Sequence, residues 1–258
     1  MIKTDKFKKD DVLLIADFGR SAQGWLSYIL SYVLNARYIE PYNLLSGSKY
    51  SKSNIIEKNT KGRLDGRETS NYTIVVKTHA FPAKEINLTK SIIYLTRDPR
   101  DVAISYYYMV RNSLKKGNIN RKLIFHIIPI LSYIITAYSW KNHFRSWQYV
   151  DSFRLRYEDL RLDTYGTISS VLSNFEVNVN KDIILEAINI FSFENCYGRK
   201  RGIEDINNIE ARKGEIGDYR NHFTKLHNII FWFICGKEAK LAGYKFDGST
   251  SIEPKNKN

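Results

Sequence analysis

Cysteine is scarce in this chain. The 258 residues include two cysteines, Cys196 and Cys235, which lie far apart in the sequence and form no CxxC spacing. A framework of disulfides and a zinc site with the usual ligand spacing are therefore excluded. We expect two reduced, buried thiols.

Long apolar runs are missing as well. The basic residues 1–9 are followed by only four apolar positions, 12–15, before Asp17, which is too short for the core of a signal peptide. A cytoplasmic protein is the simplest expectation. Residues 123–135 are almost wholly apolar but contain His126 and Pro129, and they fall short of the roughly 20 residues of a membrane span. They predict a buried helix or a hydrophobic flap over a pocket, with peripheral contact to an anionic membrane as the alternative.

Internal repeats, low-complexity tracts and linkers are absent from the sequence. Hydrophobic residues make up 43% of the chain and aromatic residues 14%, which is enough apolar surface for a full-sized core. We predict one domain over residues 1–258, with its core at about 10–245, an exposed excursion rich in Ser, Lys, Gly and Asn at 43–67, and a tail at 246–258.

Acidic residues are outnumbered. The 40 lysines and arginines exceed the 27 aspartates and glutamates, and the formal net charge is +13. Such a surface attracts anions, so nucleic acid, acidic glycans, anionic lipid and nucleotide phosphates are all candidate partners. A lysine-rich surface that only keeps the protein soluble is the alternative. Charge alone does not choose between them.

Apolar runs alternate with helical patterns along the chain. Strands are predicted at residues 11–17, 73–76, 92–95 and 153–157, and helices at 24–34, from Pro99 onward, within 160–190 and at 224–241. Continuous apolar strands bounded by polar residues are typical of a parallel sheet buried on both faces. The sequence therefore predicts an α/β fold of three layers, with a central parallel sheet covered by helices.

Ligands of such sheets bind beyond the carboxyl ends of the strands. After the first strand, residues 19–25 form a loop that opens into a helix. Its backbone N–H groups and Arg20 could hold a phosphate. The GxxxxGK[ST] motif of P-loop nucleotidases is absent, so taken alone this loop is equally well a structural turn.

Two further strand ends carry cations. Lys77 and His79 follow the second strand, and alternation places them on one side if the backbone stays extended. An ammonium can stabilise developing negative charge while an imidazole removes a proton; a solvated lysine and a histidine bonded to backbone are the alternative. Arg97 ends the third strand and Ser105 lies two turns into the next helix, and the pair could bind a second anion.

A late basic turn supplies more donors for that anion. It consists of Arg212, Lys213 and the backbone amide of Gly214. A basic turn by itself is usually solvated surface, and Arg100 and Asp101 would by the same reasoning form a surface ion pair. The joint occurrence of these pieces, in this order along the chain, favours a nucleotide with two anionic groups.

The sequence resembles the PAPS-dependent sulfotransferases, whose nucleotide-binding fold is related to the P-loop kinases. The blocks typical of that family are YPKSGTTW, K-T/S-H-x-P, R-N/D-P-x-D-x-x-x-S-Y and R-K-G-x-x-G-D-W-K-N-x-F-T. The corresponding blocks here are FGRSAQGW at 18–25, KTHAFP at 77–82, RDPRDVAISY at 97–106 and RKGEIGDYRNHFT at 212–224. The resemblance spans residues 10–245, and the last block is its most specific part.

The resemblance implies a role for each matching residue. The 5′-phosphosulfate end of PAPS would be held by Arg20, Ser21, Ala22, Gln23, Gly24 and Trp25, and the 3′-phosphate by Arg97, Ser105, Arg212, Lys213 and Gly214. Trp25 and Phe193 look like the aromatic residues that flank adenine, and Tyr157 looks like a further nucleotide contact. Core packing is the alternative for Phe193 and Tyr157. His79 would be the general base, with Lys77 and Arg20 stabilising the transferring group, and no metal would be required.

The loop departs from the family pattern. Arg20 stands where many members have lysine, and Ala22 replaces a glycine, which is tolerable if the φ angle of Ala22 is negative. Gln23 and Gly24 replace two threonines whose hydroxyls would face the phosphate. These changes put the affinity for the cofactor in question.

The sequence thus predicts a sulfotransferase that moves the sulfuryl group of PAPS to a hydroxyl, or as a less favoured choice an amine, of a small-molecule, glycan or lipid-linked acceptor, releasing adenosine 3′,5′-bisphosphate (PAP). A magnesium-dependent phosphotransferase and an inactive, polyanion-binding relative are the rival hypotheses, and a specific nucleic-acid partner is not expected. The acceptor and the oligomeric state are not determined by the sequence.

Overall fold

A computed structural model of the chain describes residues 9–39, 71–82, 89–115, 128–205, 208 and 210–250. These residues form two compact units. Unit 1 comprises Met1–Leu95 and Val150–Ser192, and unit 2 comprises Thr96–Tyr149 and Phe193–Asn258. The predicted excursion at 43–67, residues 123–127 of the apolar run and residues 251–258 of the tail lie outside the described residues.

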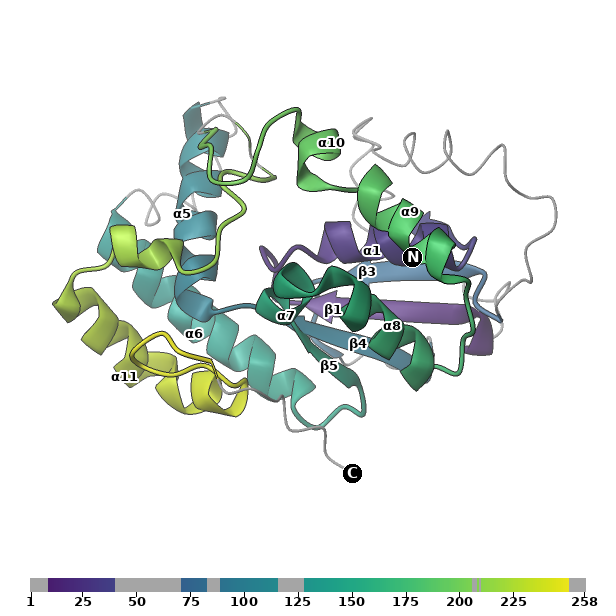
Figure 1. Ribbon diagram of the computed structural model, residues 1–258. Coiled ribbons are helices and arrows are strands. Elements are labelled where there is room, and N and C mark those ends of the chain that lie inside the picture. Colours follow the sequence, from purple (N-terminus) through teal and green to yellow (C-terminus); the bar gives the residue numbers. More distant parts are fainter. Residues whose placement is uncertain are drawn as a thin grey trace. The chain divides into compact units, whose positions relative to one another are not determined.

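Unit 1 is built on a five-stranded sheet (Figure 1). The strands are β1 (Val12–Asp17), β2 (Arg37–Ile39), β3 (Ile74–Thr78), β4 (Ser91–Thr96) and β5 (Phe153–Arg156), in the order β2-β3-β1-β4-β5. The strand β1 pairs in parallel with β3 and β4, and β2 pairs in parallel with β3. All six residues of β1 are buried, as expected for a central strand with both faces covered.

Helices flank this sheet. The helix α1 (Gln23–Val33) contacts β1, β2 and β3 and packs on α9 (Lys181–Ile190), which contacts α8 (Thr164–Asn174); α8 in turn contacts α7 (Tyr157–Leu162). Figure 1 shows these helices beside the strands of unit 1. The predicted α/β fold with a central parallel sheet is confirmed. The strand β2 was not predicted, because three residues are too few for a clear apolar pattern.

Unit 2 is helical. Its long helices are α5 (Pro99–Lys115), α6 (Pro129–Trp147) and α11 (Lys225–Leu241), and α6 packs against both of the others (Figure 1). The helix α10 (Phe193–Tyr197) and the 3-10 turn η4 (Asp218–Asn221) complete it. As predicted, α5 begins at Pro99, a residue that suits the first turn because it has no N–H to satisfy.

The apolar run at 123–135 is in part a helix. Its residues 129–135 form the first turns of α6, which continues to Trp147 and buries Tyr133, Ala137 and Trp140. A helix is therefore confirmed for these residues, but of residues 129–135 only Ser132 and Tyr133 are buried, while Pro129 is exposed and the others are half-buried. In the parts of the chain that the structure covers, no helix is long and apolar enough to cross a membrane.

Arg100 and Asp101 do not form a surface ion pair, and that expectation was wrong. Both side chains are buried. The guanidinium of Arg100 makes a bidentate bond to Asp98, donates to Asn228 and to the carbonyls of Lys245 and Phe246, and stacks on the ring of Tyr219 at 4.1 Å. This arginine joins the start of α5 to the end of the described chain. The two cysteines are free, with Cys235 buried as expected and Cys196 only half-buried.

Candidate active site

The loop between β1 and α1 has an unusual backbone. Gly19 has a φ of 106°, and Arg20 and Ala22 each have a φ of 65°. The condition under which alanine would be tolerable at this position, a negative φ, is therefore not met, because Ala22 adopts the left-handed conformation that glycine adopts without strain. Backbone that mixes right- and left-handed residues is the kind that forms anion-binding nests, and residues with positive φ stand at three of the four positions 19–22.

Ala22 also precedes the first turn of α1. It is the N-cap residue and offers no side-chain cap. The first N–H groups of an α-helix have no partner within the helix, and the helix dipole gives them a positive potential. The strained loop and the start of α1 together present donors at the carboxyl end of β1, which is the place predicted for an anion.

The side chain of Gln23 is engaged within the protein. Its Nε2 donates to the carbonyl of Ile15 at 2.5 Å and to the carbonyl of Thr78 at 3.0 Å. The side chain is buried and joins the ends of β1 and β3, so it does not face a phosphate as the family's threonine would. The backbone N–H of Gln23 is the part that stays available for the predicted role.

His79 follows β3 directly and makes a short contact with a buried acid. Its Nδ1 lies 2.5 Å from Oδ1 of Asp17, and the histidine side chain is 35% exposed while that of Asp17 is fully buried. Burial alone would lower the pKa of His79, and the positive charge of Lys77 lowers it further. The charge and hydrogen bonds of Asp17 outweigh both effects, so the pKa of His79 is raised above its ordinary value of 6.5.

The loop and His79 lie next to each other. A side-chain carbon built on Gly19 would come within 3.8 Å of the imidazole Nδ1, so the loop backbone runs along the histidine ring. Lys77 lies in β3, in register with Ile15 of β1, and its charge acts on His79. Unit 1 thus brings the loop, Lys77 and His79 to one end of the sheet, as predicted from the strand ends.

The remaining predicted residues of unit 1 lie on helices. Gly24 and Trp25 are in the first turn of α1, and Tyr157 begins α7 directly after β5. Tyr157 is buried, which fits the core-packing alternative. Beside it, Arg156 and Asp159 form a two-point ion pair at 2.7 and 2.8 Å.

Unit 2 contains the residues that were predicted to bind the second anion. The guanidinium of Arg97 donates to the carbonyl of Glu215 at 2.8 Å. Asp101 in the first turn of α5 accepts the N–H groups of Gly217 at 2.6 Å and of Tyr219 at 2.9 Å. These bonds hold the late basic turn against the start of α5, as the resemblance implied for Arg97 and the late block.

Acidic residues neutralise the cations of this turn. Arg212 pairs with Glu204 and Asp218, and Lys213 contacts Asp218 at 3.0 Å and Glu215 at 3.7 Å. Burial would raise the pKa of Asp218, but hydrogen bonds from His222, Asn221 and Lys213 and the charge of Arg212 outweigh burial and lower it well below its usual value. The hydrogen bond to Asp218 likewise raises the pKa of Lys213.

Ser105 lies on the face of α5 that meets this turn. It is four residues after Asp101 and three before Tyr108, and residues at these spacings share one helix face. Tyr108 lies under the guanidinium of Arg212, 4.4 Å from ring centroid to Cζ. Arg97, Ser105 and Arg212 are therefore gathered at one place in unit 2, as predicted.

Gly214 is required where it stands. It has a φ of 69°, and a side-chain carbon there would come within 2.8 Å of the ring of Phe193. Phe193 is buried, with the guanidinium groups of Arg201 and Arg199 4.7 and 5.0 Å from its ring. These contacts are those of the core-packing alternative, and a contact of Phe193 with adenine stays a prediction.

The sequence did not point to the acids of the two sites. Asp17, Asp101, Asp218 and Glu204 were not predicted to contact site residues. For Asp17 a signal was present, because it occupies the end of β1, next to the strand that ends before His79. For Asp218 and Glu204 no pattern in the sequence reveals the pairing.

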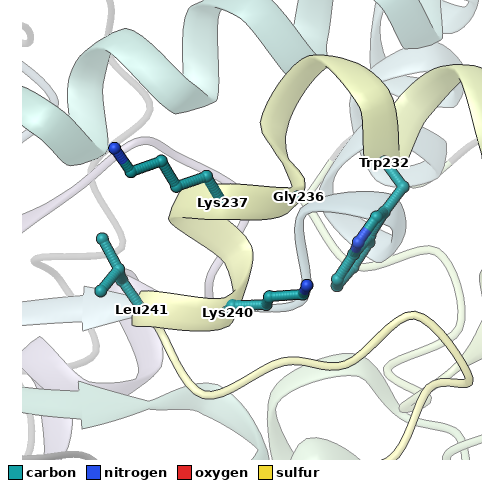
Figure 2. A pocket seen from close by; sticks show the side chains of 5 residues that line it. All are labelled: Trp232, Gly236, Lys237, Lys240 and Leu241. Atoms are coloured by element: carbon teal, nitrogen blue, oxygen red, sulfur yellow. The ribbon is translucent and has the colours of Figure 1, made fainter.

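A surface pocket lies elsewhere in unit 2. It has a volume of about 490 Å³ and is lined by Trp232, Gly236, Lys237, Lys240 and Leu241, all on α11 (Figure 2). Gly236 makes room for the indole of Trp232, whose ring lies 2.5 Å from where a side-chain carbon would be. None of the predicted site residues lines this pocket.

The parallel sheet, with a loop of left-handed residues between β1 and α1, defines an α/β protein with a P-loop-like fold. Residues 9–243 match the family described as the sulfotransferase domain. The chain belongs to this family, which confirms the resemblance drawn from the four sequence blocks.

Individual relatives share this assignment at low identity. The 3-alpha-hydroxysteroid sulfotransferase of Cavia porcellus is 28% identical, with 93% of this chain and 87% of that protein covered. The amine sulfotransferase of Oryctolagus cuniculus is 23% identical, with 95% and 86% covered.

Two solved structures have a similar fold. Mouse sulfotransferase SULT7A1 complexed with PAP has a TM-score of 0.60 at 18% identity and covers 92% of this chain and 86% of its own. Retinol dehydratase in a complex with retinol and PAP has a TM-score of 0.58 at 16% identity, and the match covers 92% of this chain and 83% of that one. At these identities the similarity shows the fold alone.

Proposed function

We propose that this protein is a PAPS-dependent sulfotransferase that transfers a sulfuryl group to an acceptor hydroxyl, with His79 as general base. The observation that carries the proposal is the strained loop at Gly19, Arg20 and Ala22. Left-handed non-glycine residues cost free energy and persist at sites where the conformation serves a function. Here that conformation lies beside His79 and leads into α1.

The residues of unit 2 fit a nucleotide 3′-phosphate. Arg97, Arg212 and Lys213 lie at one turn, where acidic residues balance their charges. Nε of Arg212 is buried with no hydrogen-bond partner among the described residues. A phosphate oxygen would satisfy such a donor.

Sulfuryl transfer would give a task to each of the predicted catalytic residues of unit 1. PAPS would supply a sulfuryl group joined through a bridging oxygen to a nucleotide phosphate. His79 takes the proton of the acceptor hydroxyl as the acceptor oxygen bonds to sulfur and the bridging bond breaks. Lys77 and Arg20 place positive charge where negative charge develops, and the loop holds the group in line. A sulfuryl group carries less charge than a phosphoryl group, so we propose that no metal takes part.

The acceptor is proposed to be a small molecule with a hydroxyl group. The relatives named above include a hydroxysteroid sulfotransferase and an amine sulfotransferase, and a similar fold binds retinol. Their names support a compact apolar acceptor over a glycan or a lipid-linked one. An amine is the second choice. The single domain predicted over residues 1–258 remains part of this proposal.

Discrimination between nucleotides tests the proposal. Arg212→Ala and Lys213→Ala should each weaken the binding of PAP by about 10- to 100-fold, since a hydrogen bond to a charged group is worth about 1.5–3 kcal/mol. Binding of 5′-AMP, which has no 3′-phosphate, should change by less than about 3-fold. Calorimetric titration of both ligands measures this, with the exposed Arg111→Ala as the matched control.

The rival functions give different results in the same titration. A polyanion-binding relative would bind PAP and 5′-AMP equally weakly, with strong dependence on salt. A phosphotransferase would bind ATP with magnesium in preference to PAP. Absence of any binding signal with saturating PAP would overturn the proposed function.

A further inference from the structure

Asp17 is a buried acid beside His79 that takes no part in the transfer step described above. Its side chain is fully buried at the end of β1. Only Oδ1 is satisfied, by His79, and Oδ2 is buried without a hydrogen-bond partner among the described residues. Burial of a carboxylate is costly unless it is paired and hydrogen-bonded. A carboxylate that lowers the stability of the fold in this way is a candidate for a functional role.

We propose that Asp17 is a positioning residue for His79, which fixes the imidazole with its proton on Nδ1 and stabilises the imidazolium that forms during transfer. This inference rests on the proposed function of His79 as general base. It adds a buried carboxylate, supplied by the neighbouring strand, to the lysine and histidine at the end of β3.

The sheet makes the contact rigid. In the parallel register of β1 and β3, Ala16 lies opposite Thr78, so the next residues on each strand, Asp17 and His79, lie side by side. Gln23 reinforces this register, because its amide donates to a carbonyl of each strand, at Ile15 and Thr78. The backbones of Asp17 and His79 are therefore fixed relative to each other by the strand register and by Gln23. This limits the movement of the imidazole ring.

The hydrogen bond also decides which nitrogen acts. With Nδ1–H donated to the carboxylate, Nε2 is the nitrogen that can accept a proton. The acceptor proton passes to Nε2, the ring becomes an imidazolium, and the Asp17 carboxylate compensates its charge without taking the proton. The imidazolium later returns its proton to solvent. A histidine and a carboxylate divide the work in this way when they activate a hydroxyl in other enzymes.

Charges around the ring show why a partner is needed. Desolvation and Lys77 of β3 both lower the pKa of His79, and Asp17 reverses their combined effect. Tyr94 of β4, which also faces Asp17, is neutral because burial raises its pKa far above the ordinary value. The helix α1 carries no charged side chain. Without Asp17, the groups facing His79 would leave it a weaker base than a histidine in water.

Nuclear magnetic resonance of ¹⁵N-histidine tests the geometry without any activity measurement. In the full-length protein, the neutral His79 ring should carry its proton on Nδ1 and titrate above pH 6.5, the ordinary histidine value. In Asp17→Asn the His79 titration should move to lower pH, because the charge and hydrogen bonds that raise its pKa are lost. A neutral ring protonated on Nε2, or an unchanged titration in the variant, would overturn the inference.

Kinetics separate positioning from structural support. Asp17→Asn should lower kcat by about 10- to 10⁴-fold, the range seen when the carboxylate that orients a functional histidine is removed. The affinity for PAP should stay within about 2-fold, since the hydrogen bonds of the nucleotide are untouched. The ascending limb of kcat against pH should shift to lower pH. A fall in PAP affinity equal to the fall in kcat, with no pH shift, would assign Asp17 a structural role only.

A matched control lies at the other end of β1. Thr89 donates to the carbonyl of Val12 at 2.5 Å and is buried. Thr89→Val removes a buried polar contact from the same strand without touching His79, so it should lower stability and leave the pH profile unchanged. If Asp17→Asn does not fold, the tautomer of the unaltered protein still decides the question. If the protein showed the expected tautomer but no sulfuryl transfer, the proposed function would be wrong, while the pairing of Asp17 with His79 would still hold.

Discussion

The left-handed conformation of Ala22 makes a direct prediction about stability. A non-glycine residue with φ of 65° and ψ of 28° carries a strain of about 1–2 kcal/mol. Ala22→Gly should relieve it. Glycine gains about 0.4–1 kcal/mol of additional entropy in the unfolded chain, which offsets part of the relief. The expected result is a free energy of unfolding higher by about 0.5–1 kcal/mol.

Denaturant unfolding and thermal melts measure this change. For a chain of this size, about 0.5–1 kcal/mol corresponds to a rise in Tm of about 1–4 °C. Ala187→Gly is the matched control in the same unit, because Ala187 lies buried inside α9, where glycine costs about 1 kcal/mol. The two substitutions should have opposite signs. A loss of stability in Ala22→Gly as large as that in Ala187→Gly would refute the left-handed assignment.

Two further predictions concern buried charges in unit 2. Arg100→Met should lower the free energy of unfolding by about 3–5 kcal/mol, because it leaves Asp98 without its partner. The control Arg111→Met, at an exposed position, should change the free energy of unfolding by less than about 0.5 kcal/mol. Equal effects of the two substitutions in chemical denaturation would argue against the buried contact. The lowered pKa of Asp218 stabilises the fold above its unfolded pKa of 3.8, and this contribution is lost as the pH falls through the lower folded value. The stability difference between the unaltered protein and Asp218→Asn should therefore be larger at pH 6 than at pH 3, and a difference independent of pH would contradict the pairing.

The strands and helices followed from local patterns. Residues 12–17, 74–78 and 91–96 are continuous apolar runs that end in polar residues, and Pro99 and Thr224 mark the starts of helices. Such signals act over a few residues, so they can be read without tertiary structure. The short strand β2 escaped because its place in the sheet depends on pairing with β3, which no local pattern expresses.

The sequence predicted the hydrogen-bond donors of the candidate site but not the contacts of its acidic residues. Arg97 and the late basic turn are recognisable because cations stand directly after a strand and beside a glycine. The acids that hold them, Asp101 and Asp218, stand within the family blocks, but the blocks do not say what these carboxylates contact. Only packing shows that these carboxylates are buried and bonded.

The sequence by itself determined the alternation of strands and helices and the order of the four blocks, and it predicted where anions bind, because these depend on residue type and spacing along the chain. The tertiary structure decided the sign of φ at Ala22, the use of the Gln23 amide to join two strands, and the pairing of Asp17 with His79. Each of these depends on groups far apart in the sequence that meet only when the parallel sheet brings the ends of its strands together.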